Sequence, residues 1–153
     1  MEDARVRTRD MLTNLLPEEI DWTATGVDNS IGAILYHIAL IEFDYLCADI
    51  LGMEEYFADI TAMFPWEHRD ESGHLATAPG LSLDNHLGRL DAVRSRFLET
   101  LAPFDRERLS IPRTFPDWDY DITPEWTLHH LIQHESEHRG EIGAIRSLYK
   151  AAV

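Results

Sequence analysis

The chain has 153 residues, of which 44% are hydrophobic and 27% charged, and its formal net charge is −15 at pH 7. This balance is typical of one soluble globular domain, so we expect a single domain over residues 1–153. So negative a surface argues against nucleic-acid and membrane-surface partners. The acidic start and the single cysteine, Cys47, fit a cytoplasmic protein without a signal peptide or disulfide. We expect no apolar run to approach the roughly 20 residues of a membrane span.

The first fifty residues predict two helices separated by a loop. Residues 3–16 carry apolar positions among charges at helical spacing, and a proline follows them. Residues 17–30 are expected to form a loop that ends at Ser30, a good helix N-cap. The next helix is predicted over residues 31–51, ends before a glycine, and is apolar on nearly every side. Such a helix is expected to be buried on most of its surface.

The middle of the chain predicts an irregular surface segment and a third helix. Residues 53–81 contain several Pro and Gly residues, with a short helical piece expected at 54–63. The third helix is expected to begin at Ser82 or Asp84 and to end before Pro103.

The last part of the chain predicts a small β-hairpin and a long helix. Residues 108–123 hold two short alternating runs whose prolines would limit them to edge-type pairing. Thr123 and Pro124 form an N-cap followed by a proline, and the last helix should run from there to about Lys150. Four helices with apolar faces predict an all-α four-helix bundle.

Histidines are concentrated in the last predicted helix, which holds His129, His130, His134 and His138 among the eight of the chain. Residues four apart share one helical face and can reach one metal ion together. At 100° per residue, the apolar face of this helix includes His134 and His138, while His130 lies at its edge and His129 outside it. The sequence therefore predicts His134 and His138 as the inward-facing pair.

A third protein ligand has to come from another helix of the bundle. His37 lies in the most apolar predicted helix. Taken alone, such a histidine is more often an ordinary core residue, but beside an inward pair it becomes the expected third ligand. The remaining three, His68, His74 and His86, lie in the surface segment or near the start of the third helix and are not expected to bind metal.

Two segments of the chain resemble the DinB/YfiT-like metalloenzymes. Residues 29–39, which contain His37, resemble the second helix of that family. Residues 130–141, in which His134 and His138 precede Arg-Gly, resemble its last helix. The resemblance implies a four-helix bundle that holds one divalent metal through these three histidines.

The same resemblance implies a reaction class. The family includes transferases that act on low-molecular-weight thiols, so we expect a metal-dependent thiol S-transferase with small thiol and electrophile substrates. A metal-dependent hydrolase that uses a bound water and a non-enzymatic, stress-associated metal-binding bundle are the alternatives. Zinc is the first expectation for the metal, with nickel or iron as alternatives. The resemblance also implies a homodimer. Glu141 stands where the family more often has glutamine, and adds a carboxylate near the rim of the site.

A second motif overlaps the metal ligands, because His134-Glu135-x-x-His138 also satisfies the zincin protease pattern. The absence of a suitable downstream ligand and of a predicted sheet for a peptide substrate argues against a protease. Glu135 remains the predicted catalytic residue, as a group that orients a ligand or takes a proton from a bound water or thiol. The alternative is that it pairs with Arg139 or another arginine. Glu42 is a charge in an apolar helix and needs a partner.

Two further features are assigned to packing. Cys47 lies about 15 Å along the helix from His37 and is expected to be a small core residue rather than a ligand. Aromatic side chains in and after the surface segment are more often packing than a substrate wall. Among them, Trp118 and Trp126 are the better wall candidates, and the others are Phe64, Trp66 and Tyr120.

Overall fold

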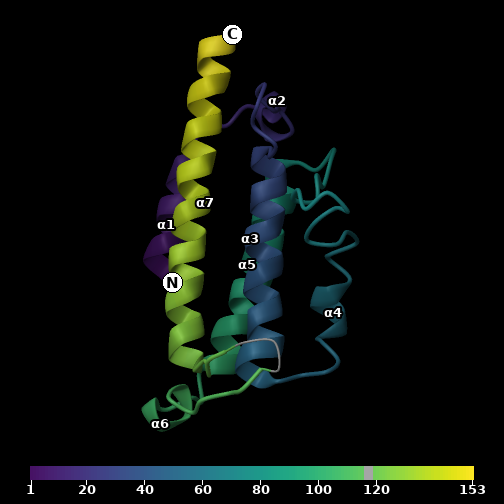
Figure 1. Ribbon diagram of the computed structural model, residues 1–153. Helices are drawn as coiled ribbons and strands as arrows, with labels where there is room; N and C mark the ends of the chain where they lie inside the picture. Colours follow the sequence, from purple (N-terminus) through teal and green to yellow (C-terminus); the bar gives the residue numbers. More distant parts are fainter. Residues whose placement is uncertain (116–118) are drawn as a thin grey trace.

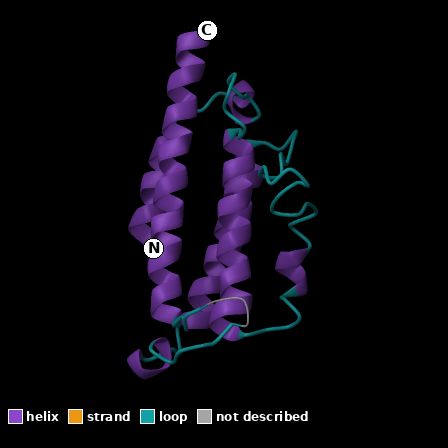
Figure 2. Ribbon diagram, viewed as in Figure 1, coloured by secondary structure: helices purple, strands orange, loops and turns teal. Residues whose placement is uncertain are grey.

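The computed structural model describes the whole chain except residues 116–118 (Figures 1 and 2). Its helices, in chain order, are α1 (Glu2–Met11), α2 (Pro17–Ile20), α3 (Ile31–Tyr45), the π-helix η1 (Leu46–Leu51), α4 (Ala58–Thr61), α5 (Leu83–Leu101), α6 (Arg106–Leu109) and α7 (Pro124–Ala152). The described residues contain no named strand. In the bundle, α3 packs against α5 and α7, and α1 packs against α7. The predicted all-α four-helix bundle is confirmed.

The first helix is shorter than predicted. α1 ends at Met11, and Asn14 adopts a left-handed conformation with a φ of 57°. A left-handed residue cannot continue a right-handed helix. The expected loop over residues 17–30 begins instead with one helical turn, α2, which has Pro17 at its first position. The prediction was therefore wrong about where α1 ends and about the first residues of the loop.

The buried second helix is confirmed and has a defined beginning and end. The Ser30 hydroxyl accepts a hydrogen bond from the backbone N–H of Ala33 at 3.1 Å and caps α3. The helix continues as η1 and ends at Gly52, whose φ of +65° is left-handed. Glycine adopts this conformation without the steric cost of a Cβ atom, which is why the helix stops there.

The combined helix over Ile31–Leu51 has 21 residues and is long and apolar enough to span a membrane by length and composition. The expectation that no run reaches this length was therefore wrong. Within the bundle, 72% of that window is buried, because α5, α7 and the segment after η1 cover it. This burial is typical of the core helix of a globular protein.

The other long helices are confirmed with their caps. Ser82 caps α5, and the Thr123 hydroxyl accepts from the backbone N–H of Trp126 to cap α7. The predicted hairpin is reduced to one antiparallel bridge between Arg113 and Ile122 within the described residues. Trp118, the predicted wall residue, lies outside the described residues.

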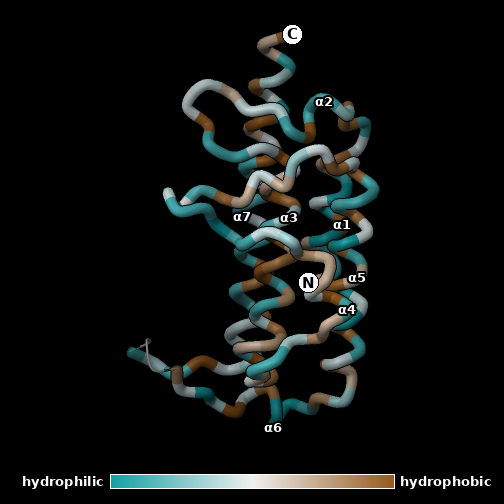
Figure 3. The backbone as a smooth tube through the Cα atoms, turned by 90° about the vertical axis from the view of Figure 1, so that its right-hand side faces the viewer, coloured by the Kyte–Doolittle hydropathy of each residue, from teal (hydrophilic) through white to brown (hydrophobic). Residues whose placement is uncertain are grey.

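The core lies between the helices and is centred on α3, as the hydropathy colouring of Figure 3 illustrates. Cys47 is fully buried there, as predicted, and burial raises the pKa of its thiol to about 11. On the side of α3 away from α7, the segment over residues 53–81 covers the helix (Figure 1). The Tyr36 hydroxyl holds this segment, because it donates to the Trp66 carbonyl at 2.5 Å and accepts from the Trp66 N–H at 3.0 Å.

Candidate metal centre

Three histidines from two helices meet where α3 packs against α7. His37 is buried on α3, whereas His134 and His138 are half-buried on α7. The Nε2 atoms of His37 and His134 lie 3.2 Å apart. The ring of His138 has its centroid 5.0 Å from that of His37 and 4.5 Å from that of His134. One ring nitrogen from each residue lies within 4.8 Å of the other two.

This geometry fits a divalent ion. Zinc–nitrogen bonds of about 2.0–2.1 Å place two ligand atoms of a tetrahedral ion about 3.3 Å apart, close to the separation observed between His37 and His134. Burial first, and the neighbouring histidines second, lower the pKa of His37 to about 3 and that of His134 to about 4. Both imidazoles are therefore neutral at pH 7, which is the state that binds a metal. In addition, Nδ1 of His37 is buried and has no hydrogen-bond partner among the described residues.

Glu141 approaches the third histidine. Its carboxylate oxygen lies 3.3 Å from Nδ1 of His138, one helical turn earlier, although the two atoms are not aligned as in a hydrogen bond. Carboxylates beside the second nitrogen of a ligand histidine commonly orient the ring. Glu141, which stands where the resembled family more often has glutamine, thus approaches the predicted ligand His138 at the rim of the site.

The cluster contains the two α7 histidines that the helix phasing placed inward, and that they bind a metal stays a prediction. His130 lies outside the cluster, stacked on the Trp126 ring at 5.1 Å and edge-on to Tyr45 at 5.2 Å. His129 is exposed. Among the residues that the structure describes, the cluster contains only His37, His134 and His138. Trp126, the second predicted wall residue, packs against His130.

The histidines of the surface segment and of α5 also lie outside the cluster. His74 is 3.5 Å from Asp70, and His68 is exposed. His86 is fully buried, and within the part of the chain that the structure describes neither of its ring nitrogens has a hydrogen-bond partner. Their exclusion from the metal cluster agrees with the prediction.

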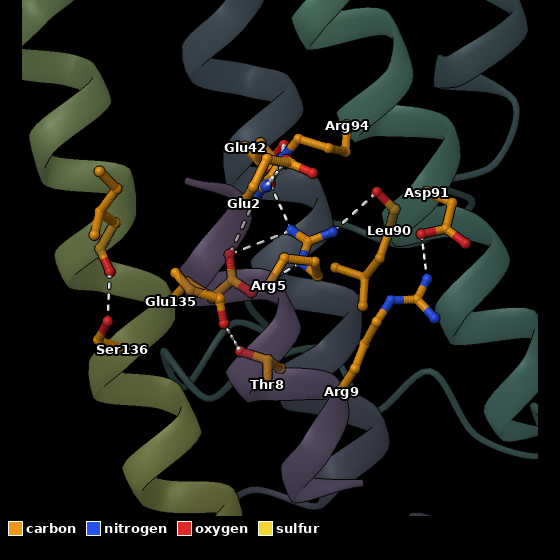
Figure 4. A network of polar contacts seen from close by, with 12 residues as sticks. Glu2, Arg5, Thr8, Arg9, Glu42, Leu90, Asp91, Arg94, Glu135 and Ser136 are labelled. Carbon is orange, nitrogen blue, oxygen red and sulfur yellow. Dashed lines mark hydrogen bonds and ion pairs between the residues drawn. The ribbon is translucent and has the colours of Figure 1, made fainter. Parts of the chain in front are cut away.

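Glu135 and Glu42 both pair with arginines (Figure 4). Glu135 is buried and accepts from Arg5 at 2.8 Å and from Arg94 at 3.2 Å. Burial would raise the pKa of Glu135, but these arginines outweigh that effect and lower it. The alternative of an arginine partner is therefore what the structure shows, although the partners are not Arg139. A role of Glu135 as proton acceptor stays a prediction.

A cavity of about 320 Å³ lies between α3 and the segment over residues 53–81. Leu40 and Ile41, one turn after His37, form part of its wall, and Trp66 and His68 from the covering segment face them. Burial first, then His134 and His138, and last Arg69 and His68 of this segment lower the pKa of His37. The sequence did not single out Trp66 as a wall residue, because nothing in its spacing links the irregular segment to α3.

These observations define a class of protein, a helical bundle in which the buried helix and the last helix meet at three clustered histidines. A sequence model of the DinB superfamily matches residues 1–142, and the chain belongs to that superfamily. No curated protein matches the sequence. A crystal structure of a conserved protein from Enterococcus faecalis has the same fold, with a TM-score of 0.70 and 17% sequence identity. The similarity covers 96% of this chain and 91% of that one.

Proposed function

We propose that this protein is a metal-dependent transferase that joins a low-molecular-weight thiol to a small electrophile. The observation that carries the proposal is the 3.2 Å separation of the His37 and His134 ring nitrogens, with His138 completing the cluster. Three protein ligands leave further positions open for water or substrate, which is typical of catalytic rather than structural sites. The choice of a thiol is supported by the resemblance of the two histidine-bearing segments to the DinB/YfiT-like enzymes.

A divalent ion at this position supplies Lewis-acid chemistry that lowers the pKa of a thiol or water. The residues of the chain prepare the site for it in two ways. Burial keeps His37 and His134 neutral, so that protons do not compete for their nitrogens at pH 7. The cavity between α3 and the covering segment, with Trp66 and Ile41 in its wall, offers apolar surface for the body of a substrate.

The experiment compares zinc-loaded and chelator-treated protein in the conjugation of 1-chloro-2,4-dinitrobenzene with cysteine, glutathione and coenzyme A. The loaded protein should accelerate at least one conjugation above the buffer rate, and chelation should abolish the acceleration. His134→Ala should behave like the chelated protein, whereas His130→Ala should behave like the wild type. If no thiol is conjugated faster than in buffer while the loaded protein cleaves p-nitrophenyl acetate, the transferase proposal is wrong and the hydrolase replaces it.

A further inference from the structure

A buried network of charges joins the four main helices beside the metal centre (Figure 4). Its members are Arg5 of α1, Glu42 of α3, Arg94 of α5 and Glu135 of α7, and all four are buried. We call this set the charge network. Two buried arginines thus face two buried carboxylates, and Arg94 also bonds the exposed Glu2 at 2.9 Å.

Each arginine bridges both carboxylates. Arg94 holds Glu42 through two bonds of 2.5 and 2.9 Å and reaches Glu135 at 3.2 Å. Arg5 donates to Glu42 at 2.7 Å and to Glu135 at 2.8 Å. Paired guanidinium–carboxylate bonds have a narrow range of geometry, so they restrict the relative position of the groups that they join. The network therefore couples the position of Glu42 to that of Glu135.

The two glutamates lie on the two helices that carry the metal ligands. Glu135 directly follows His134, and Glu42 comes five residues after His37, which is about 7.5 Å along α3. The side chains around Glu42 on α3 are largely apolar, and apolar contacts restrict the axial position of a helix less sharply than paired charges do. A slip of one helical turn, about 5.4 Å, would separate His37 from His134 beyond the reach of one ion.

Stability by itself does not explain why four charges occupy this place. Well-packed hydrophobic side chains in place of a buried ion-pair network are often neutral or stabilising. We propose that Glu42, Arg94, Arg5 and Glu135 are positioning residues, which fix the axial register of α3 against α7 and thereby bring the three histidines together. This inference rests on the proposed metal-dependent function, and it assigns Glu135 to positioning rather than to proton transfer.

The test measures zinc affinity by competition with a chromophoric chelator and, separately, the melting temperature of the metal-free protein. Glu135→Gln and Arg94→Lys should each lower zinc affinity by about tenfold or more, as loss of groups that orient metal ligands typically does. Glu19→Gln is the matched control, because Glu19 is also buried and pairs at 3.3 Å with Arg146, another α7 residue that lies eight positions beyond His138. The control should lower the melting temperature and leave zinc affinity unchanged.

Unchanged zinc affinity in Glu135→Gln, with a lower melting temperature, would limit the network to stability and overturn the proposal. If Glu135→Gln does not fold, Arg94→Lys, which keeps the charge, provides the same comparison. A wild-type protein that binds no metal would refute the proposed function instead. In that case, NMR contacts between the His37 and His134 rings in the metal-free protein decide whether the charge network positions α3 against α7. Their loss in Arg94→Lys and survival in Glu19→Gln support positioning, and their survival in both contradicts it.

Discussion

The Nε2 atoms of His37 and His134 lie 3.2 Å apart, although 97 positions separate the two residues in the chain. Two neutral imidazoles with facing nitrogens, one buried and one half-buried, gain little from each other, since only one of the two nitrogens can donate a hydrogen bond to the other. An ion bound by both nitrogens would explain the arrangement. Substitution of each histidine in turn therefore measures its contribution to metal binding.

Metal content should follow the helix phasing. Elemental analysis of protein purified without an affinity tag should find about one divalent ion per chain. Replacement of His37, His134 or His138 with alanine removes a ligand and should abolish most of this content. His130→Ala should retain it, because the His130 ring stacks on Trp126 outside the cluster. Retention in His138→Ala together with loss in His130→Ala would contradict the assignment.

Turnover of Glu135→Gln should depend on metal concentration. If Glu135 positions the ligand helix, saturating zinc restores the occupied site, and kcat should return close to the wild-type value. If Glu135 instead takes a proton, as the sequence predicts, kcat should stay low at full occupancy, because the amide cannot accept the proton. Steady-state rates measured across a zinc titration separate the two roles.

Stability of the metal-free protein should fall in mildly acidic solution, in part because of His86. Burial first, and the charge of Arg89 second, lower the pKa of His86 from 6.5 to about 4. Between these values the unfolded chain binds a proton that the folded protein does not, so the free energy of unfolding falls as pH drops from about 6.5 to about 4. Urea unfolding at several pH values should show a flatter dependence for His86→Leu. His129→Gln, at an exposed position, should keep the wild-type slope.

Two glycines should respond oppositely to alanine. Gly52 has a φ of +65°, and a Cβ atom there would lie 1.6 Å from the Arg113 guanidinium, which donates to the carbonyl of Ile50. Gly52→Ala should destabilise the protein by about 1–2 kcal/mol from the left-handed conformation alone. Gly140 lies inside α7 with open space around it, so Gly140→Ala should stabilise by about 1 kcal/mol. Chemical denaturation measures the change in the free energy of unfolding for both variants. A stabilising Gly52→Ala would contradict the left-handed end of the buried helix.

The sequence by itself determined the features that depend on local periodicity. The 3.6-residue period and the capping residues Ser82 and Thr123 predicted the helices, and the same period distinguished His134 and His138 from His130. His37 was added because an inward pair on the last helix needs a third ligand from another helix. The helices and the phasing of α7 depend only on residues within a few turns of one helix, which is why the sequence predicts them.

Only the tertiary structure decided which groups meet across helices. The sequence indicated that Glu42 needed a partner, and it left the role of Glu135 open. That both share Arg5 and Arg94 depends on the rotation and axial register of four helices at once. Likewise, the place of Trp66 beside α3 depends on an irregular segment without a period to read. Contacts of this kind are set by packing over the whole bundle, so no local pattern in the chain specifies them.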